Sequence, residues 1–302
     1  MRDFSATDAA FEGFRLTREH PRAILFWASA HLIISTALFA AVVSIFGDQF
    51  DSLDPVGASR DPNVAMAAIR KILPLYLLIV PYGFILLSVF SAAVFRMVLR
   101  PSDRGLGYLK LGDDELRLVA LSVVYSILAV GVVSLVTLAA GMGAAIIGIV
   151  VGPALGLLDV LIVFMALAVV VYLAVRLSLA GPMTFAEKRI CVFESWELTR
   201  GHFWRMFGAY VLSFGVTLIV LLLAAAITWG VGAAVSGGAL SKGAAMLRPQ
   251  LLNLPNLFAP AMLIAGVLSS LTWALYFALV FAPAAVIYRD LAHNPRHDAV
   301  FA

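Results

Sequence analysis

The apolar stretch Leu118–Leu138 reads LVALSVVYSILAVGVVSLVTL and contains no charged residue. An α-helix of about 20 apolar residues is long enough to cross the ~30 Å hydrocarbon core of a bilayer. This stretch therefore predicts a transmembrane helix. Five further apolar runs of comparable length predict that the whole chain crosses a membrane six times: Ala23–Phe46, Ile72–Val98, Ala154–Ala180, Met206–Val231 and Ala259–Tyr288.

The composition of the 302-residue chain agrees with this interpretation, because 62% of its residues are hydrophobic and only 13% are charged. Soluble domains carry about 25% charged residues. We therefore expect an all-α fold in which residues 1–302 form one polytopic membrane domain. A glycine-rich segment that begins at Gly141 and ends at Gly152-Pro153 is predicted to connect the third and fourth spans.

The distribution of basic residues predicts the orientation of the spans, because short cytoplasmic loops carry the excess of Lys and Arg. With both termini inside, 16 of the 21 basic residues lie on the cytoplasmic side. The first outer loop is instead acidic. The prediction is a multi-pass protein of a bacterial inner membrane with both termini in the cytoplasm. The residues on which it rests are four basic residues before the first span, five within 96–117, five within 176–205, Arg289 and Arg296, and the outer Asp48, Asp51, Asp54 and Asp61.

Net charge and cysteine content exclude two other classes of function. The net charge of +3 follows from the basic cytoplasmic loops, so it gives no support for binding of nucleic acid. Cys191 is the sole cysteine and falls in a predicted cytoplasmic segment, so no intrachain disulfide can form.

A ten-residue motif occurs twice, each time just ahead of a long apolar run. Phe11–His20 reads FEGFRLTREH, and Phe193–His202 reads FESWELTRGH, with six identical positions. Such a recurrence predicts repeated units. We consider three parallel repeats, at residues 5–100, 101–182 and 183–295, each an in-plane amphipathic helix followed by a transmembrane hairpin. Two alternatives stay open: only the first and last copies are related, or aromatic and basic flanks simply serve any inner-membrane helix.

The in-plane helix is best defined in the last repeat, where Thr184–Thr199 has an apolar and a polar face. Thr184 followed by Glu187 has the spacing of a capping box at a helix start. A comparable pattern covers Thr7–Glu19. A degenerate third copy is expected at Leu106–Gly112, ahead of the acidic helix start Asp113–Glu115.

Basic residues in and beside these segments suggest a function at the membrane surface. Lys and Arg near an anionic leaflet each contribute about 1 kcal/mol of attraction. The first hypothesis is a non-enzymatic membrane protein that engages anionic lipid headgroups or a partner, which includes another protein or a second copy of this chain. The candidate binding residues are Arg18, Arg100, Arg104, Lys110, Lys188, Arg189 and Arg200.

Among the ionisable residues at membrane depth, where such groups are costly and point to function, two are worth naming. His31 lies nine residues after Arg22, and Asp159 six residues after Pro153. A water-lined cavity that holds both would suit a transporter of small solutes or lipids, which is the alternative function. Each also has a simpler interpretation: His31 bonds to a Ser, Thr or Tyr of a neighbouring helix, and Asp159 marks a helix start.

No pattern of catalytic residues is present in the sequence. The five histidines are scattered, and neither the G-x-S-x-G motif of hydrolases nor a phosphate-binding P-loop occurs. We therefore predict no enzymatic activity, no metal and no cofactor.

Two stretches in the latter half carry a family resemblance: the segment 176–182, RLSLAGP, and the segment 193–208, FESWELTRGHFWRMFG. Together with the ending Tyr288-Arg289-Asp290-Leu291 they resemble the bacterial membrane domain associated with glycerophosphoryl diester phosphodiesterase and related polytopic proteins. In fused members of that family a separate soluble domain performs the hydrolysis. This chain has no room for such a domain, so the resemblance implies a membrane scaffold without the hydrolase activity.

Overall fold

The computed structural model describes residues 4–51, 62–151, 156–235 and 259–292. Within these ranges the chain is helical and contains no strand. Six of the helices are long and four elements are short. The long helices are α2 (Pro21–Asp51), α4 (Pro62–Leu99), α5 (Asp113–Val151), α6 (Gly156–Leu177), α9 (Phe203–Val235) and α12 (Pro260–Ala292), and the short elements are α1 (Ala6–Glu19), η1 (Gly105–Tyr108), α7 (Ala180–Glu187) and α8 (Glu194–Leu198).

The six long helices confirm the predicted transmembrane helices. Each contains a window that is apolar and long enough to cross a membrane. Apolar side chains remain exposed along all of them, as expected for surfaces that lipid covers. The chain is therefore an all-α, multi-pass membrane protein.

The predicted connection at Gly141 is wrong, because α5 continues through this glycine as far as Val151. A helix in lipid keeps its backbone hydrogen bonds internally, and glycine is common in transmembrane helices. The segment 152–155, which contains Pro153, lies outside the described residues. The glycines at the end of the third span therefore lengthen the helix and do not begin a loop.

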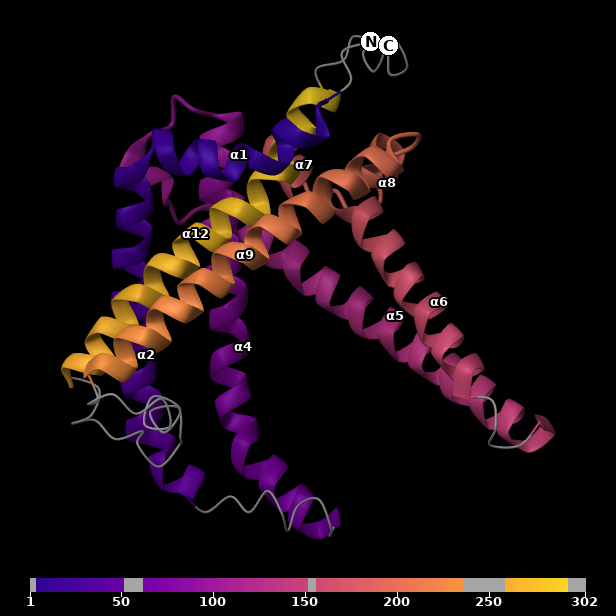
Figure 1. Ribbon diagram of the computed structural model, residues 1–302. Helices are drawn as coiled ribbons and strands as arrows, with labels where there is room; N and C mark the ends of the chain where they lie inside the picture. The colour runs from indigo at the N-terminus through magenta and orange to yellow at the C-terminus, as the bar shows by residue number, and fades with distance from the viewer. Residues whose placement is uncertain (1–3, 52–61, 152–155, 236–258, 293–302) are drawn as a thin grey trace.

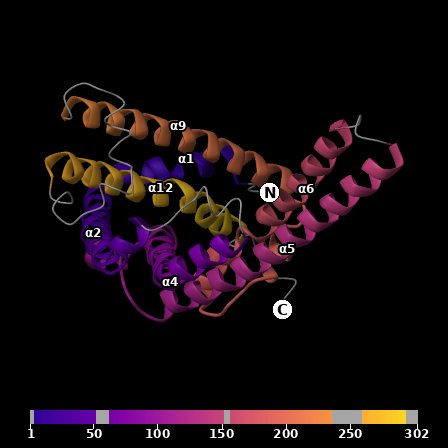
Figure 2. The same cartoon turned by 90° about the horizontal axis from the view of Figure 1, so that it is seen from below.

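Helix α12 is the centre of the bundle, since it packs against α1, α2, α4 and α9. Helices α5 and α6 form a hairpin that joins the bundle at one end only and projects away from it (Figures 1 and 2). The short elements α1, α7 and α8 lie at the end where this hairpin joins the others (Figure 1). We call this end, formed by α1, η1, α7, α8 and the segments that join them, the short-helix face.

The core is densest where α2, α4 and α12 meet. The ring of Phe90 stacks on the ring of Phe277 with centroids 4.7 Å apart, and Trp27 meets Phe90 edge to face at 5.9 Å. Small residues such as Ala92 and Ala93 on α4 are fully buried beside them. Close approach of backbones at small residues is typical of packing between transmembrane helices.

Helix α1 crosses α12 at a very close contact. Its first turn is capped by Ser5, whose hydroxyl accepts the Asp8 N–H at 3.2 Å. A Cβ on Gly13 would lie only 2.6 Å from the Leu279 Cα, so no side chain fits at this position. Glycine therefore allows α1 to lie directly on the backbone of α12, next to α9 (Figure 2).

The predicted continuous helix over Thr184–Thr199 is wrong, because the region forms two helices, α7 and α8, with a turn between them. Lys188 adopts φ +58°, in the left-handed region, and ends α7. Thr184 lies inside α7, where its hydroxyl accepts the Cys191 N–H at 3.0 Å. That bond, across seven residues, stabilises the turn in place of the expected capping box.

The two copies of the ten-residue motif share part of their packing. Gly13 lies on the backbone of α12, and the Ser195 hydroxyl donates to the Arg176 carbonyl of α6 at 2.7 Å. Leu16 and its counterpart Leu198 are both buried. The short elements α1, η1 and α8 contact α12, α4 and α6 respectively, which in each case is the last helix of another hairpin, although η1 contacts α2 more extensively than α4. This pattern is compatible with three repeats, which stay a prediction.

Candidate functional site

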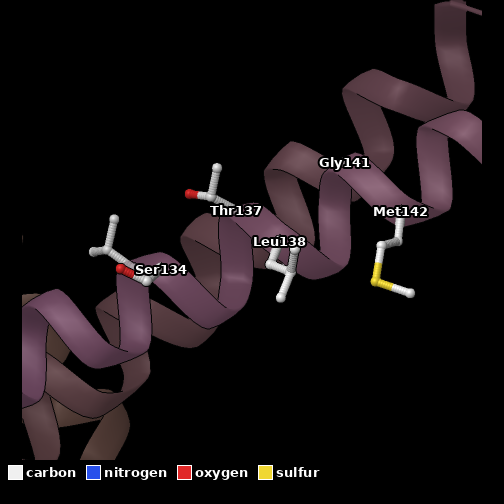
Figure 3. A pocket seen from close by; sticks show the side chains of 6 residues that line it. Ser134, Thr137, Leu138, Gly141 and Met142 are labelled. Carbon is white, nitrogen blue, oxygen red and sulfur yellow. The ribbon is translucent and has the colours of Figure 1, made fainter.

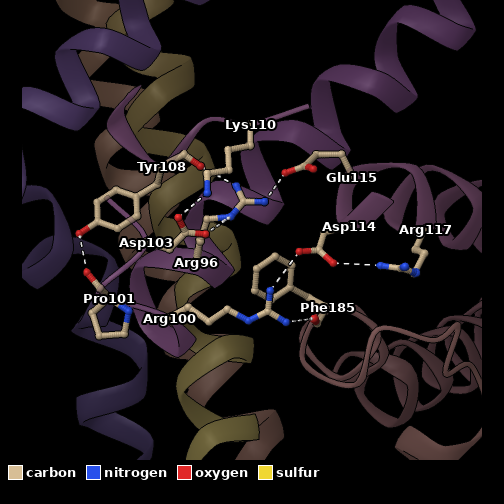
Figure 4. Close-up of polar contacts among 10 residues, drawn as sticks. All are labelled: Arg96, Arg100, Pro101, Asp103, Tyr108, Lys110, Asp114, Glu115, Arg117 and Phe185. Carbon is tan, nitrogen blue, oxygen red and sulfur yellow. Dashed lines mark hydrogen bonds and ion pairs between the residues drawn. The ribbon is translucent and has the colours of Figure 1, made fainter. Parts of the chain in front are cut away.

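The short-helix face contains a cluster of ion pairs between the end of α4 and the start of α5 (Figure 4). The Arg96 guanidinium donates to the Glu115 carboxylate, and both side chains are almost fully buried. Asp103 adds a second carboxylate, with its Oδ2 3.6 Å from Arg96 Nε. A buried guanidinium is stable only when paired and hydrogen-bonded. The cluster therefore fixes the angle between α4 and α5.

A second, partly exposed group of charges extends this cluster toward α7. Arg100 donates to Asp114 at 3.0 Å and to the Phe185 carbonyl at 2.9 Å. Its guanidinium lies over the Phe185 ring, 4.5 Å from the centroid. Asp114 also accepts a bond from Arg117 at 3.0 Å. Arg100 thus connects α4, α5 and α7 through an ion pair, a hydrogen bond and a cation–π contact.

Lys110 is also engaged within the chain, because its ammonium donates to Asp103. This bond lowers the pKa of the Asp103 carboxyl, so Asp103 is charged at neutral pH. On the far side of α7, Arg189 donates to Glu187 and Glu194, each at 2.9 Å. The side chains of Lys110 and Arg189 are therefore already used by carboxylates of the protein.

Cys191 is buried in the turn between α7 and α8. Burial, together with the nearby Glu187 carboxylate, raises the pKa of the thiol to about 11. A thiol that stays protonated is a poor nucleophile and a poor metal ligand. Cys191 thus fits a packing role, as its backbone bond to Thr184 suggests.

The seven basic residues singled out from the sequence fall into two groups. Arg100, Lys110 and Arg189 are paired with carboxylates, as described above. The other four are exposed. None of them takes part in the ion pairs of the described residues. Arg104 donates only to the Pro101 carbonyl, at 3.2 Å. The exposed group, which we call the open basic set, consists of Arg18, Arg104, Lys188 and Arg200.

His31 is buried on α2, where its Nδ1 lies 3.1 Å from the Ser270 hydroxyl of α12. The ring stacks on Trp273, with centroids 6.0 Å apart, and lies 6.4 Å from Phe90. A histidine that bonds to a neighbouring helix among packed aromatic rings fits the simpler of the two sequence interpretations. His31 therefore contributes to packing between α2 and α12.

Asp159 lies in the first turn of α6. Its side chain is outside the described residues, so the water-lined cavity that would hold both Asp159 and His31 stays a prediction. A pocket elsewhere lies along one side of α5, and Figure 3 shows the side chains that border it. Its lining is mainly apolar, with hydroxyls only from Ser134 and Thr137: Val133, Ser134, Thr137, Leu138, Gly141 and Met142.

Within the described ranges no three His, Cys, Asp or Glu residues come together in a way that could hold a metal ion. Sequence reasoning also missed two charged residues of the face. In the sequence, Arg96 counts only among the cytoplasmic basic residues within 96–117, and Glu115 only as part of a helix start. One feature of the sequence could have indicated that the two residues pair: Arg96 precedes the short connection 100–112, and the oppositely charged Glu115 follows it.

Comparison with known proteins gives no relative: no family model, no curated protein and no solved structure matches this chain. The class of this protein therefore rests on its fold and on the short-helix face alone. It is an all-α integral membrane protein whose described residues contain six helices able to span a membrane, with one end covered by short helices and ion pairs. The resemblance to the phosphodiesterase-associated membrane domain stays a prediction.

Proposed function

We propose that this chain is a non-enzymatic protein of a bacterial inner membrane whose short-helix face lies in the cytoplasm and binds anionic lipid headgroups. The observation that carries the proposal is the division of the basic residues. Carboxylates of the protein neutralise Arg96, Arg100, Lys110 and Arg189, whereas the open basic set projects without such partners.

Charge and position support the same conclusion. The open basic set is distributed over α1, the segment before η1, the end of α7 and the segment after α8. Each of these positions is close to an end of a transmembrane helix, so the four side chains are within reach of headgroups. At about 1 kcal/mol for each basic residue near an anionic leaflet, four of them contribute about 4 kcal/mol.

Exposed aromatic side chains accompany the basic residues. Phe11 and Phe14 of α1 are exposed although the opposite side of that helix is buried. Phe193 and Trp204 are exposed on either side of α8. Aromatic rings next to Lys and Arg are typical of the interface between water and lipid.

The experiment compares the full-length protein in nanodiscs of phosphatidylcholine with the protein in discs that also contain phosphatidylglycerol. We expect a higher melting temperature in the anionic discs, because lipid that binds the folded state stabilises it. Glutamine substitution of the open basic set should abolish most of this difference.

The matched control removes four basic residues that are already paired, so that both variants lose the same net charge. It substitutes glutamine at Arg15, Lys110, Arg117 and Arg189. This control should keep the lipid-dependent difference, although its melting temperature in either disc can be lower. Equal loss of the difference in both variants would refute direct headgroup binding by the open basic set.

A further inference from the structure

The segment at η1 has an unusual backbone. Leu106, Gly107 and Tyr108 have φ angles of +34°, +65° and +67°, so three successive residues are left-handed. Glycine adopts this region at little cost, but leucine and tyrosine do so only when the surrounding structure imposes it. A strained backbone of this kind indicates that the segment holds a particular side chain in place.

Two buried side chains hold the segment in this conformation. The Trp27 indole of α2 donates to the Gly107 carbonyl at 2.6 Å. The Arg96 guanidinium of α4 donates to the next carbonyl, that of Tyr108, also at 2.6 Å. The donors of these two bonds come from two different helices, and together they hold two successive carbonyls of the segment.

The consequence is that two side chains of the segment, two positions apart, differ sharply in exposure. Tyr108 is buried, with 3% of its surface exposed, whereas Leu106 is 76% exposed. Gly107 between them lies on α2, where a Cβ would be 3.2 Å from the Phe26 ring. Leu106 is thus placed beside the first turns of α2, where Leu25 and Phe26 are also exposed.

Two exposed basic residues lie close to this apolar patch in the sequence. Arg22 lies in the first turn of α2, and Arg104 lies just before η1. Apolar side chains next to arginines, at the level where a transmembrane helix begins, match the boundary between lipid headgroups and acyl chains. The chemistry therefore fits a lipid surface better than water.

We infer that Leu106 is a wedge that the strained η1 segment inserts into the bilayer interface, between headgroups and acyl chains, beside the start of α2. The inference rests on the proposed function, because it assumes that the short-helix face meets lipid. It adds the mode of contact: an apolar side chain inserted by a rigid backbone, with Arg22 and Arg104 at the phosphates.

The test places a fluorescent NBD group at position 106, by labelling Leu106→Cys in a Cys191→Ala background. The full-length protein is reconstituted in phosphatidylcholine vesicles that contain lipids with a nitroxide near the top of the acyl chain. We expect a shift of the emission to shorter wavelength and a loss of fluorescence from quenching. The matched control is Ser102→Cys in the same background, which lies on the exposed part of the same connection and should show neither.

Equal quenching at positions 102 and 106, or none at 106, would overturn the inference. A further variant, Trp27→Phe, keeps an aromatic ring but removes the donor to Gly107. It should reduce quenching at position 106 toward that at position 102, and unchanged quenching would show that Trp27 does not hold the wedge. Because these vesicles lack anionic lipid, failure of anionic headgroup binding would leave the quenching intact, so the two outcomes can be told apart.

Discussion

Arg96 donates a hydrogen bond to Glu115 where α4 ends and α5 begins, and the two side chains are 2% and 5% exposed. The same guanidinium donates to the Tyr108 carbonyl. Arg96 therefore joins two transmembrane helices and the connection between them. Removal of one partner of a buried ion pair leaves an uncompensated charge, which costs far more than the loss of a surface pair.

The first prediction concerns this pair. Arg96→Met should reduce the free energy of unfolding by roughly 3 kcal/mol, because it leaves the Glu115 carboxylate buried without its partner. Glu115→Leu should cost less, because Asp103 Oδ2 still lies 3.6 Å from Arg96 Nε. The double variant should recover a large part of the loss, since both charges are then absent. The measurement is a double-mutant cycle in detergent, with unfolding followed by circular dichroism. Strictly additive losses would contradict the account, and Lys110→Gln, which breaks an exposed pair, should cost less than about 1 kcal/mol.

The second prediction concerns the crossing of α1 and α12. Gly13→Ala should lower the melting temperature, because the new Cβ would meet the backbone of Leu279 and Ala278 at 2.6 and 2.8 Å. Gly208→Ala is the matched control, since this helical glycine has nothing within 4 Å of its Cβ position. There the substitution should stabilise α9 by up to about 1 kcal/mol through helix propensity. Equal effects at the two glycines would show that α1 does not lie on α12 as described.

The third prediction concerns pH. Burial raises the pKa of Glu12 on α1, although Arg15 and Arg289 act in the opposite direction. A carboxyl with a raised pKa in the folded state binds its proton more tightly there than in the unfolded state. Its contribution to stability is therefore complete below the unfolded pKa, near 4.5, and is lost as the pH rises through the folded pKa.

Glu12→Gln removes this titration. We compare the melting temperature at pH 4.5 with that at pH 7. Relative to its value at pH 7, the melting temperature at pH 4.5 should be lower in the variant than in the natural chain. Differential scanning fluorimetry at a series of pH values is the measurement. Identical pH profiles would contradict the raised pKa of Glu12. Glu19→Gln, on an exposed part of the same helix, is the control.

The fourth prediction concerns Cys191. Its thiol is buried and has a pKa of about 11, so alkylation by iodoacetamide at neutral pH should be very slow in the folded protein and fast after unfolding in SDS. Thr184→Val removes the acceptor of the Cys191 N–H while it keeps the side-chain shape. This variant should alkylate faster, because the turn between α7 and α8 opens more often. Mass spectrometry gives the rates, and fast alkylation of the natural chain would contradict the described turn.

The six spans were predictable because long apolar runs have few alternatives in a bilayer, where every backbone polar group must be bonded. The end of the third span was not, since Gly141 is compatible with a turn in water and with a helix in lipid. Local sequence also could not place Thr184 correctly. Thr184 and Glu187 have the spacing of a capping box, but the Thr184 hydroxyl instead accepts the N–H of Cys191, seven residues away.

The candidate site was only partly predictable for a related reason. Sequence identified the basic residues of the short-helix face, yet it could not tell which of them meet a carboxylate. Lys110 pairs with Asp103, and Arg104 has no acidic partner in the described chain, although they lie in the same short connection. Which residues pair depends on how the connection folds. Trp27 of α2 and Arg96 of α4 determine that conformation through their hydrogen bonds to the connection.

The central claim is that the open basic set binds anionic headgroups directly. The most direct measurement is native mass spectrometry of protein extracted in mild detergent from vesicles of mixed phosphatidylcholine and phosphatidylglycerol, with the retained lipids counted. The account predicts that the natural chain and the control variant with Arg15, Lys110, Arg117 and Arg189 changed to Gln retain phosphatidylglycerol preferentially. The variant with Arg18, Arg104, Lys188 and Arg200 changed to Gln should lose that preference, and the same retention in all three proteins would contradict the claim.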